Sequence, residues 1–200
     1  MNSKFFDLKQ EKQDRMINAA LKIFAMNGYK HASTDDIVKE AGISKGLLFH
    51  YFDSKIGVYS FLSEYSARYM ALELSSAIDP SETSYMEIRR QMEAAKMQTL
   101  KTYPYMEMFL QACKNETVEE AVTATRSAKE TYEDSLATVL SKADMSDINA
   151  NKDSSMYLKM LDYTTDSLMR DHFKGDVFDA QAYYKDVVKY INLVEKTILK

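Results

Sequence analysis

The sequence predicts an all-α fold of about nine helices. Only 5 Gly and 2 Pro occur among 200 residues, too few for the many tight turns of an all-β fold. Apolar residues recur at helical spacing along most of the chain, and Ser, Asp and Gly stand where helices begin and end. A hydrophobic share of 46% supplies ample side chains for a core.

The first two predicted helices lie in the N-terminal quarter. One covers residues 9 to 27, and the Asn27-Gly28 pair ends it. Ser33 is the expected N-cap of the second helix, with Asp36 three residues later as a short capping-box partner. Gly42 stands where a left-handed C-cap residue is needed, so the second helix is short.

Ser44 and Ser54 are two further N-caps at close spacing. Ser44 opens a helix from Lys45 to Tyr51, and Ser54 opens a long helix from Lys55. Helices this short are unstable alone, so they must pack on a neighbour. Residues 33 to 55 therefore have the form of a helix-turn-helix, whose second helix enters the major groove of DNA.

Residues 9 to 55 resemble the DNA-binding domain of the TetR family of bacterial transcriptional regulators. The matching positions fit in one register without a gap: Ala20, Phe24, Asn27-Gly28-Tyr29, Ser33-Thr34, Ile37-Val38, Ala41 to Gly46, Leu48 to Phe52, and Ser54-Lys55. The resemblance implies a DNA-binding domain over residues 1 to 55 and a helical effector-binding and dimerisation domain over residues 56 to 200. It also implies a homodimer, a palindromic operator and a small-molecule effector.

The distribution of charge fits that division. Residues 1 to 55 hold nine Lys/Arg and seven Asp/Glu, a net of +2, whereas the remainder holds 17 basic and 23 acidic residues, a net of −6. The whole chain, at −4, hides this asymmetry. A mildly basic head on an acidic body predicts modest non-specific affinity for DNA with clear salt dependence.

The expected DNA contacts come from the helix-turn-helix and the start of the next helix: Thr34, Ser44, Lys45, Gly46, Leu47, Phe49, His50, Tyr51 and Lys55. Lys45 begins the recognition helix and can donate to guanine O6 or N7. Gly46 allows close backbone approach at a cost of about 1 kcal/mol in helix propensity. Asp35 is expected to stabilise the helix dipole rather than contact DNA.

The remaining contacts divide between bases and phosphates. Leu47 and Phe49 are candidates to touch thymine methyl groups, although ordinary packing is the alternative for both. The hydroxyl of Tyr51 and the ring of His50 are expected to reach phosphates. Lys55 and the free N–H groups of its helix would clamp one phosphate together.

The body of the chain continues as helices. Their expected ranges are Lys55 to about Ile78, Ser81 to about Thr102, Pro104 to about Cys113, Asn115 to Ser141, Ser154 to Lys174 with Gly175 as C-cap, and Asp179 to Leu199. Residues 143 to 153 are polar and predict a loop. The last two helices are apolar on more than one face, which favours a dimer interface built from two helices per subunit over a central core helix.

An effector pocket is the least determined feature. The chain has 13 Met and 14 Tyr but no Trp, and Met and Tyr suit an adaptable apolar wall with hydroxyl groups. The expected lining residues are Met92, Met97, Tyr103, Tyr105, Met106, Phe109 and Tyr132, with core packing as the alternative for each. Together they predict a fairly large, mostly apolar effector.

Other functional classes have less support. We find no Gly-rich phosphate loop, no His-x-x-x-His pair and no nucleophile with a matched base, so we expect neither an enzyme nor a cofactor or metal. The single Cys113 fits a reducing cytoplasm. We expect a repressor that is released when an effector shifts the helix beginning at Lys55. A ligand-independent or corepressor-dependent regulator, and a protein-binding module without DNA binding, remain the alternatives.

Overall fold

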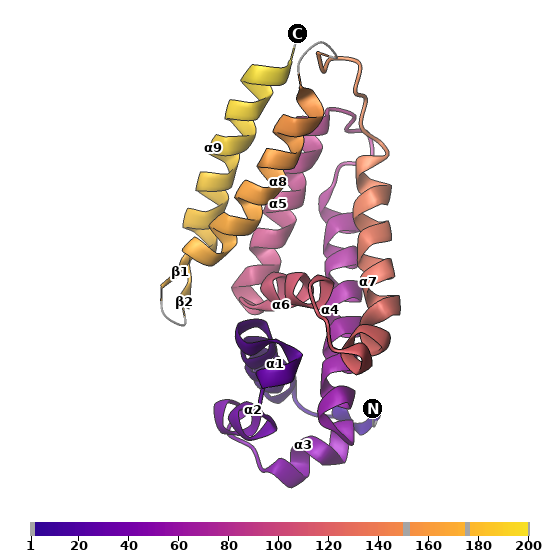
Figure 1. Ribbon diagram of the computed structural model, residues 1–200, viewed down its shortest axis with the longest axis vertical. Helices are drawn as coiled ribbons and strands as arrows, with labels where there is room; N and C mark the ends of the chain where they lie inside the picture. The colour runs from indigo at the N-terminus through magenta and orange to yellow at the C-terminus, as the bar shows by residue number, and fades with distance from the viewer. Residues whose placement is uncertain (1–2, 150–152, 175–176, 200) are drawn as a thin grey trace. The chain divides into compact units, whose positions relative to one another are not determined.

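The computed structural model describes residues 3–149, 153–174 and 177–199, and within them it confirms the all-helical class. Figure 1 shows the order of the elements. They are the 3-10 helix η1 (Ser3–Phe5) and the helices α1 (Gln10–His31), α2 (Thr34–Ala41), α3 (Lys45–Phe52), α4 (Lys55–Ala77), α5 (Tyr85–Thr102), α6 (Met106–Lys114), α7 (Glu119–Leu140), α8 (Ser154–Asp171) and α9 (Ala180–Ile198), with β1 (Phe173–Lys174) and β2 (Val177–Phe178) between the last two.

The chain divides into two compact units. Unit 1 comprises Met1–Ala71 and Thr102–Glu133, and unit 2 comprises Leu72–Lys101 and Asp134–Lys200. These two units are defined by which residues contact one another in space. The boundary expected at residue 55 instead separates the DNA-binding function from effector binding and dimerisation. The functional boundary therefore stays a prediction.

Three N-caps and one C-cap are confirmed in unit 1. The hydroxyl oxygen of Ser33 accepts from the Asp35 N–H at 3.1 Å, and that of Ser44 accepts from the Leu47 N–H at 3.2 Å. The hydroxyl oxygen of Ser54 accepts from the Gly57 N–H at 3.1 Å. Because these caps satisfy N–H groups that a helix start leaves free, they fix where α2, α3 and α4 begin.

Gly42 and Gly28 adopt positive φ angles. Gly42 has φ 62° and ψ 41°, the left-handed conformation predicted for the C-cap of α2. Gly28 has φ 65° and ψ 175°, which breaks the helical path at the predicted position. A further helical turn nevertheless follows Gly28, so α1 continues to His31 instead of ending at residue 27.

The predicted start of α5 at Ser81 is wrong. The carboxylate of Asp79 accepts both the Ser81 N–H at 2.8 Å and the Ser81 hydroxyl at 2.7 Å. The hydroxyl is therefore used in a local turn and does not cap a helix. Ser84 receives the Glu87 N–H at 3.4 Å, and α5 begins at Tyr85.

Two other predicted helix ends are also wrong. The helix expected from Asn115 begins at Glu119, after Glu116 has accepted the N–H groups of Thr117 and Val118 at 2.8 and 2.9 Å. The helix expected to reach residue 174 ends at Asp171. A two-residue antiparallel ladder follows it, with Phe173 opposite Phe178 and Lys174 opposite Val177. The expected C-cap Gly175 lies outside the described residues.

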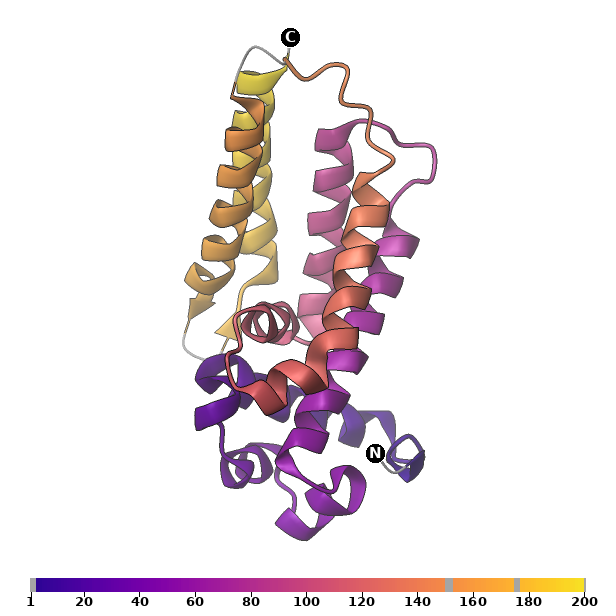
Figure 2. The same ribbon diagram turned by 45° about the vertical axis from the view of Figure 1, so that its right-hand side comes forward.

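The ladder joins two helices of unit 2 that lie side by side. Figure 2 shows that α8 and α9 pack against each other along their length. Four apolar side chains on these helices are buried, with at most 1% of their surface exposed: Leu161, Met169, Val187 and Ile191. Another apolar set on the same two helices is open to solvent: Met156, Met160, Tyr163, Tyr190 and Leu193, exposed by 42 to 63%.

The core of unit 2 also contains a buried charge. Glu93 on α5 has no exposed surface, and its carboxylate accepts from the Tyr183 hydroxyl at 2.8 Å and from Lys96 at 3.2 Å. Arg89, 7% exposed on the same helix, pairs with Asp162 at 2.6 Å. A buried carboxylate with these partners is satisfied in place, so it ties α5 to α9.

Candidate nucleic-acid interface

The helix-turn-helix is held by a small apolar core under α2 and α3. Ile37 and Ala41 of α2 and Leu48 of α3 are at most 1% exposed. Between the helices, the Ile43 N–H donates to the Val38 carbonyl at 3.0 Å, which closes the turn. These contacts leave the opposite face of α3 outward.

The predicted contact residues fall into three groups by exposure. Ser44, Lys45, Gly46 and His50 are exposed; Thr34, Leu47, Phe49 and Lys55 are half-buried; Tyr51 is buried at 7% exposure. Leu48 and Phe52 lie in the core, at 1 and 4% exposure. All the predicted residues except Tyr51 thus keep at least part of their surface exposed, whereas Tyr51 lies in the core.

Lys45 is held by an acidic neighbour on α2. Its ammonium nitrogen lies 2.8 Å from one carboxylate oxygen of Asp35 and 3.1 Å from the other. Both side chains are exposed, by 49% and 70%. Asp35 therefore does more than lie in the first turn of its helix, because its carboxylate also pairs with the ammonium that is expected to read bases.

Lys55 is directed toward the end of α1. Its ammonium lies 4.6 Å from the centre of the Tyr29 ring and donates to the Lys30 carbonyl at 3.4 Å. Burial alone would raise the pKa of Glu116, but three backbone N–H groups, with a smaller contribution from Lys55, hold that pKa below its ordinary value. The expected phosphate clamp is thus partly engaged within the subunit.

The end of α1 is fastened to the corner between α6 and α7. The Tyr29 N–H donates to Glu116 at 3.0 Å, and the Tyr29 hydroxyl donates to Glu120 at 3.1 Å. Burial, followed by the hydrogen bond to Glu120, raises the pKa of Tyr29 to about 12, so this hydroxyl stays a donor at neutral pH. Figure 2 shows α6 lying against α1.

Sequence reasoning missed two features that shape this site. Phe5 is fully buried, with its ring 5.1 Å from Phe52, 5.3 Å from Phe61 and 5.7 Å from Tyr51. The sequence signal for this packed segment is the pair of aromatic residues, Phe5-Phe6, that precedes the first helix. The second feature is Gly57, where a Cβ atom would collide with the carbonyl group of Phe52 at the end of α3.

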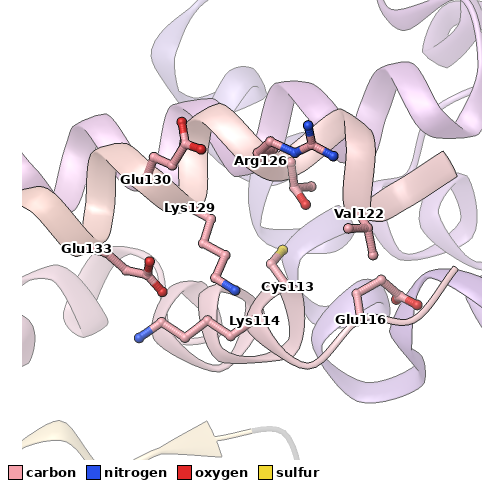
Figure 3. Close-up of a pocket in the computed structure, with 9 residues that line it drawn as sticks. Cys113, Lys114, Glu116, Val122, Arg126, Lys129, Glu130 and Glu133 are labelled. Carbon is pink, nitrogen blue, oxygen red and sulfur yellow. The ribbon is translucent and has the colours of Figure 1, made fainter. Parts of the chain in front are cut away.

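A cavity lies between α6 and α7 within unit 1. It has a volume of about 420 Å³ and is lined by Cys113, Lys114, Glu116, Val122, Thr125, Arg126, Lys129, Glu130 and Glu133. Figure 3 shows charged side chains from both helices directed around it, with the sulfur of Cys113 at its inner side. The Cys113 thiol donates to the Tyr59 hydroxyl at 3.3 Å, and burial raises the pKa of Cys113 to about 12.

The expected effector residues do not line this cavity. Met92 and Met97 belong to unit 2, whereas Tyr103, Tyr105, Met106, Phe109 and Tyr132 belong to unit 1. All except the half-buried Met97 are buried, at 5% exposure or less. The Tyr103 hydroxyl donates to Asp14 at 2.6 Å, and the Tyr132 hydroxyl donates to Glu107 at 2.8 Å. Two of the expected ligand hydroxyls are thus used in internal bonds.

The helices that the structure describes include none long and apolar enough to cross a membrane.

Comparison with known sequences places the strongest likeness on the helix-turn-helix. A family model described as "Bacterial regulatory proteins, tetR family" matches residues 16–59. The uncharacterized HTH-type transcriptional regulator YuxN of Bacillus subtilis is 48% identical over 46 residues, 23% of this chain and 16% of that protein. IcaR, the negative regulator of the biofilm operon icaADBC in Staphylococcus aureus, is 38% identical over 47 residues, 24% of this chain and 25% of its own length. The chain thus spans no more than 25% of these curated relatives.

Comparison with solved structures extends the likeness to the whole fold. A TetR family regulator from Chloroflexus aurantiacus matches with a TM-score of 0.64 and 17% identity, covering 100% of this chain and 98% of that one. FadR of Bacillus subtilis, solved in complex with stearoyl-CoA, matches with a TM-score of 0.59 and 17% identity, covering 88% of this chain and 96% of that one. At such identities the likeness is one of fold.

Proposed function

We propose that the chain, whose residues 16–59 match the tetR family of bacterial regulatory proteins and whose fold is like that of a TetR family regulator, binds a palindromic DNA operator as a homodimer and is released by a small-molecule effector. The observation that carries the proposal is the outward face of α3. Ser44, Lys45, Gly46 and His50 are exposed there, while Leu48 anchors the helix from the other side. An α-helix presented in this way fits the major groove.

The surroundings of Gly46 add support. A Cβ atom built at this position meets nothing within 4 Å. The subunit itself therefore gives no steric reason for a glycine, although glycine costs about 1 kcal/mol in a helix. A close DNA backbone supplies such a reason. The proposed contacts are those predicted from the sequence, with Lys45, Leu47 and Phe49 facing bases and Thr34, His50, Tyr51 and Lys55 facing phosphates.

Lys45→Ala and Lys55→Ala should weaken DNA binding in different ways. We expect Lys55→Ala to weaken binding to all sequences and to lower the salt slope by about one, because a phosphate contact is lost. Lys45→Ala should instead cost about 1–3 kcal/mol on a preferred sequence only. Titrations at several salt concentrations, on an enriched and an unrelated duplex, would distinguish them. Equal effects of the two variants on both duplexes would refute the assignment.

The exposed apolar residues of α8 and α9 support the homodimer. Met156, Met160 and Tyr163 recur at helical spacing on α8, and Tyr190 and Leu193 do so on α9. Two helices from each subunit would make a four-helix interface related by a two-fold axis. Such a dimer matches a two-fold operator with half-sites about 34 Å apart or a multiple of that spacing.

Leu193→Glu should convert the dimer to a monomer. Leu193 is 61% exposed in the single chain, so a glutamate there is harmless to the monomer but carries a charge into the proposed interface. We expect dimerisation to weaken by on the order of 30-fold or more, the loss typical of a central interface residue. Light scattering at micromolar concentration measures it. Leu72→Glu on α4, where Leu72 is 70% exposed, is the matched control and should leave the oligomeric state unchanged.

The contacts at the end of α1 support a route for effector control. Glu116 holds Tyr29, Cys113 contacts Tyr59, and Tyr103 donates to Asp14, so movement of α6 or of its corner with α7 reaches α1 and α4 inside unit 1. An effector lowers DNA affinity only if it binds the DNA-incompetent state more tightly. We propose a repressor released in this way in the bacterial cytoplasm.

Two locations for the effector follow from the residues. The Met and Tyr set predicted from the sequence favours a mostly apolar effector, and the FadR structure with stearoyl-CoA is a fold relative that holds a ligand with a long apolar chain. The charged cavity between α6 and α7 is the second location, because Cys113 and Glu116 line it and also contact α4 and α1.

Screening by thermal shift, followed by DNA release, tests the effector proposal. Apolar acyl compounds and small charged metabolites form the two ligand sets, and Lys129→Ala, in the cavity wall, separates the two locations. Stabilisation with release of DNA supports a repressor; stabilisation with tighter DNA binding indicates a corepressor system. DNA binding that no ligand alters would favour a ligand-independent regulator, and absence of DNA binding would favour a protein-binding module.

A further inference from the structure

The ion pair between Lys45 and Asp35 crosses the turn of the helix-turn-helix. Asp35 is the second residue of α2, and Lys45 is the first residue of α3. Both carboxylate oxygens face the ammonium, at 2.8 and 3.1 Å. The proposed base-reading cation therefore carries its own counter-charge, on the surface that would face DNA.

We propose that Asp35 is a specificity-determining residue that withholds Lys45 from phosphates and yields it to base edges. This inference rests on the proposed DNA-binding function. On unrelated DNA, a free lysine gains affinity by neutralising a phosphate and releasing a counterion. A carboxylate held against the ammonium cancels that attraction and repels the phosphate itself.

The Lys45–Asp35 pair interacts differently with a base edge in the major groove than with a phosphate. Guanine O6 and N7 accept from an ammonium without carrying a full negative charge, so the neighbouring carboxylate repels them far less than a phosphate. The carboxylate can also accept from the amino group of cytosine. Because both side chains are largely exposed, by 49% and 70%, the pair is weak enough to open when such a partner is present.

The adjacent residue provides a matched control. Asp36 is also acidic, exposed and in the first turn of α2, and it forms no ion pair within the described part of the chain. Asp35→Asn and Asp36→Asn therefore change the net charge and the helix-dipole interaction by the same amount. They differ in whether Lys45 is released.

The experiment uses the full-length chain and a DNA sequence enriched by the wild-type protein from a random duplex library. Dissociation constants are measured for this duplex and for an unrelated duplex of equal length and composition, at several salt concentrations. We expect Asp35→Asn to lower the ratio of unrelated to enriched dissociation constants by about fivefold. It should also raise the salt slope on unrelated DNA by about one. Asp36→Asn should leave the ratio unchanged.

A second substitution at Asp35 and a Lys45→Ala background test whether the effect arises from the loss of the ion pair. Asp35→Ser should act like Asp35→Asn, since both remove the carboxylate, and thermal unfolding checks that each variant is folded. In a Lys45→Ala background, Asp35→Asn should behave as Asp36→Asn does. An Asp35→Asn ratio equal to that of Asp36→Asn would overturn the inference while leaving DNA binding intact. A wild-type protein that enriches no sequence would overturn the proposed function itself.

Discussion

Glu93→Ala is expected to lower the free energy of unfolding by about 3–5 kcal/mol, the range for breaking a buried ion pair by removing one partner. Glu93 has no exposed surface, and its truncation removes a buried carboxylate that accepts from both the Tyr183 hydroxyl and the ammonium of Lys96. The carboxylate also balances the charge of Arg89, which raises the cost of removing it.

A glutamate on the same helix provides the control. Glu87 pairs with Arg90 at 3.1 Å, but its side chain is 40% exposed. Glu87→Ala should therefore change stability by no more than about 1 kcal/mol. Chemical denaturation followed by circular dichroism measures both variants. Equal stabilities for Glu87→Ala and Glu93→Ala would contradict the role assigned to the buried carboxylate.

The same carboxylate gives stability a dependence on pH. Burial alone would raise the pKa of Glu93, but Lys96 and Arg89, together with the Tyr183 hydrogen bond, hold it below its ordinary value. A group whose pKa is lowered in the folded state adds stability above its unfolded pKa, near 4.3. That contribution is lost as the pH falls below about 4, through the folded pKa. Glu93→Gln should accordingly flatten the acid side of the stability curve.

Gly57→Ala should disrupt the junction between the recognition helix and α4. A Cβ atom on Gly57 would overlap the carbonyl oxygen of Phe52 and lie 3.1 Å from its carbon. The backbone there has little freedom to retreat, because Asp53 already holds φ at 63° and the Ser54 N–H donates to the same carbonyl at 2.7 Å. We expect a loss of at least about 1–3 kcal/mol in stability and loss of specific DNA binding.

Gly46→Ala is the matched control for this substitution. Its Cβ meets nothing within 4 Å, and alanine gains up to about 1 kcal/mol of helix propensity over glycine. Gly46→Ala should thus raise the melting temperature and lower the affinity for DNA. Gly57→Ala should lower both the melting temperature and the affinity for DNA. A Gly57→Ala protein as stable as the wild type would show that α4 can shift without cost.

Local signals in the sequence were enough for the helix-turn-helix but not for the contacts around it. Ser33, Gly42 and Ser44 act on residues no more than five positions away, so their roles could be predicted from spacing alone. The pairing of Lys45 with Asp35 depends on the angle at which α3 leaves the turn, and that of Glu116 with Tyr29 joins residues 87 positions apart. Such contacts follow from tertiary packing, which periodicity does not encode.

The errors in helix boundaries have a common physical origin. At Ser81, and again before Glu119, acidic side chains accept backbone N–H groups in local turns and delay the start of the helix. At Phe173 a pair of aromatic rings, 4.8 Å apart across the ladder, ends α8 earlier than periodicity suggested. Competition from side chains, rather than weak helical propensity, sets these ends.

The reactivity of the buried Cys113 thiol can report the separation of α6 from α4. Burial raises the pKa of this thiol to about 12, so the thiol is almost wholly protonated at pH 8 and alkylation of the closed form is very slow. Opening of the contact with Tyr59 would expose the thiol and restore ordinary reactivity. Since the chain has 1 cysteine, the labelling rate reads how often α6 separates from α4, with no engineered probe.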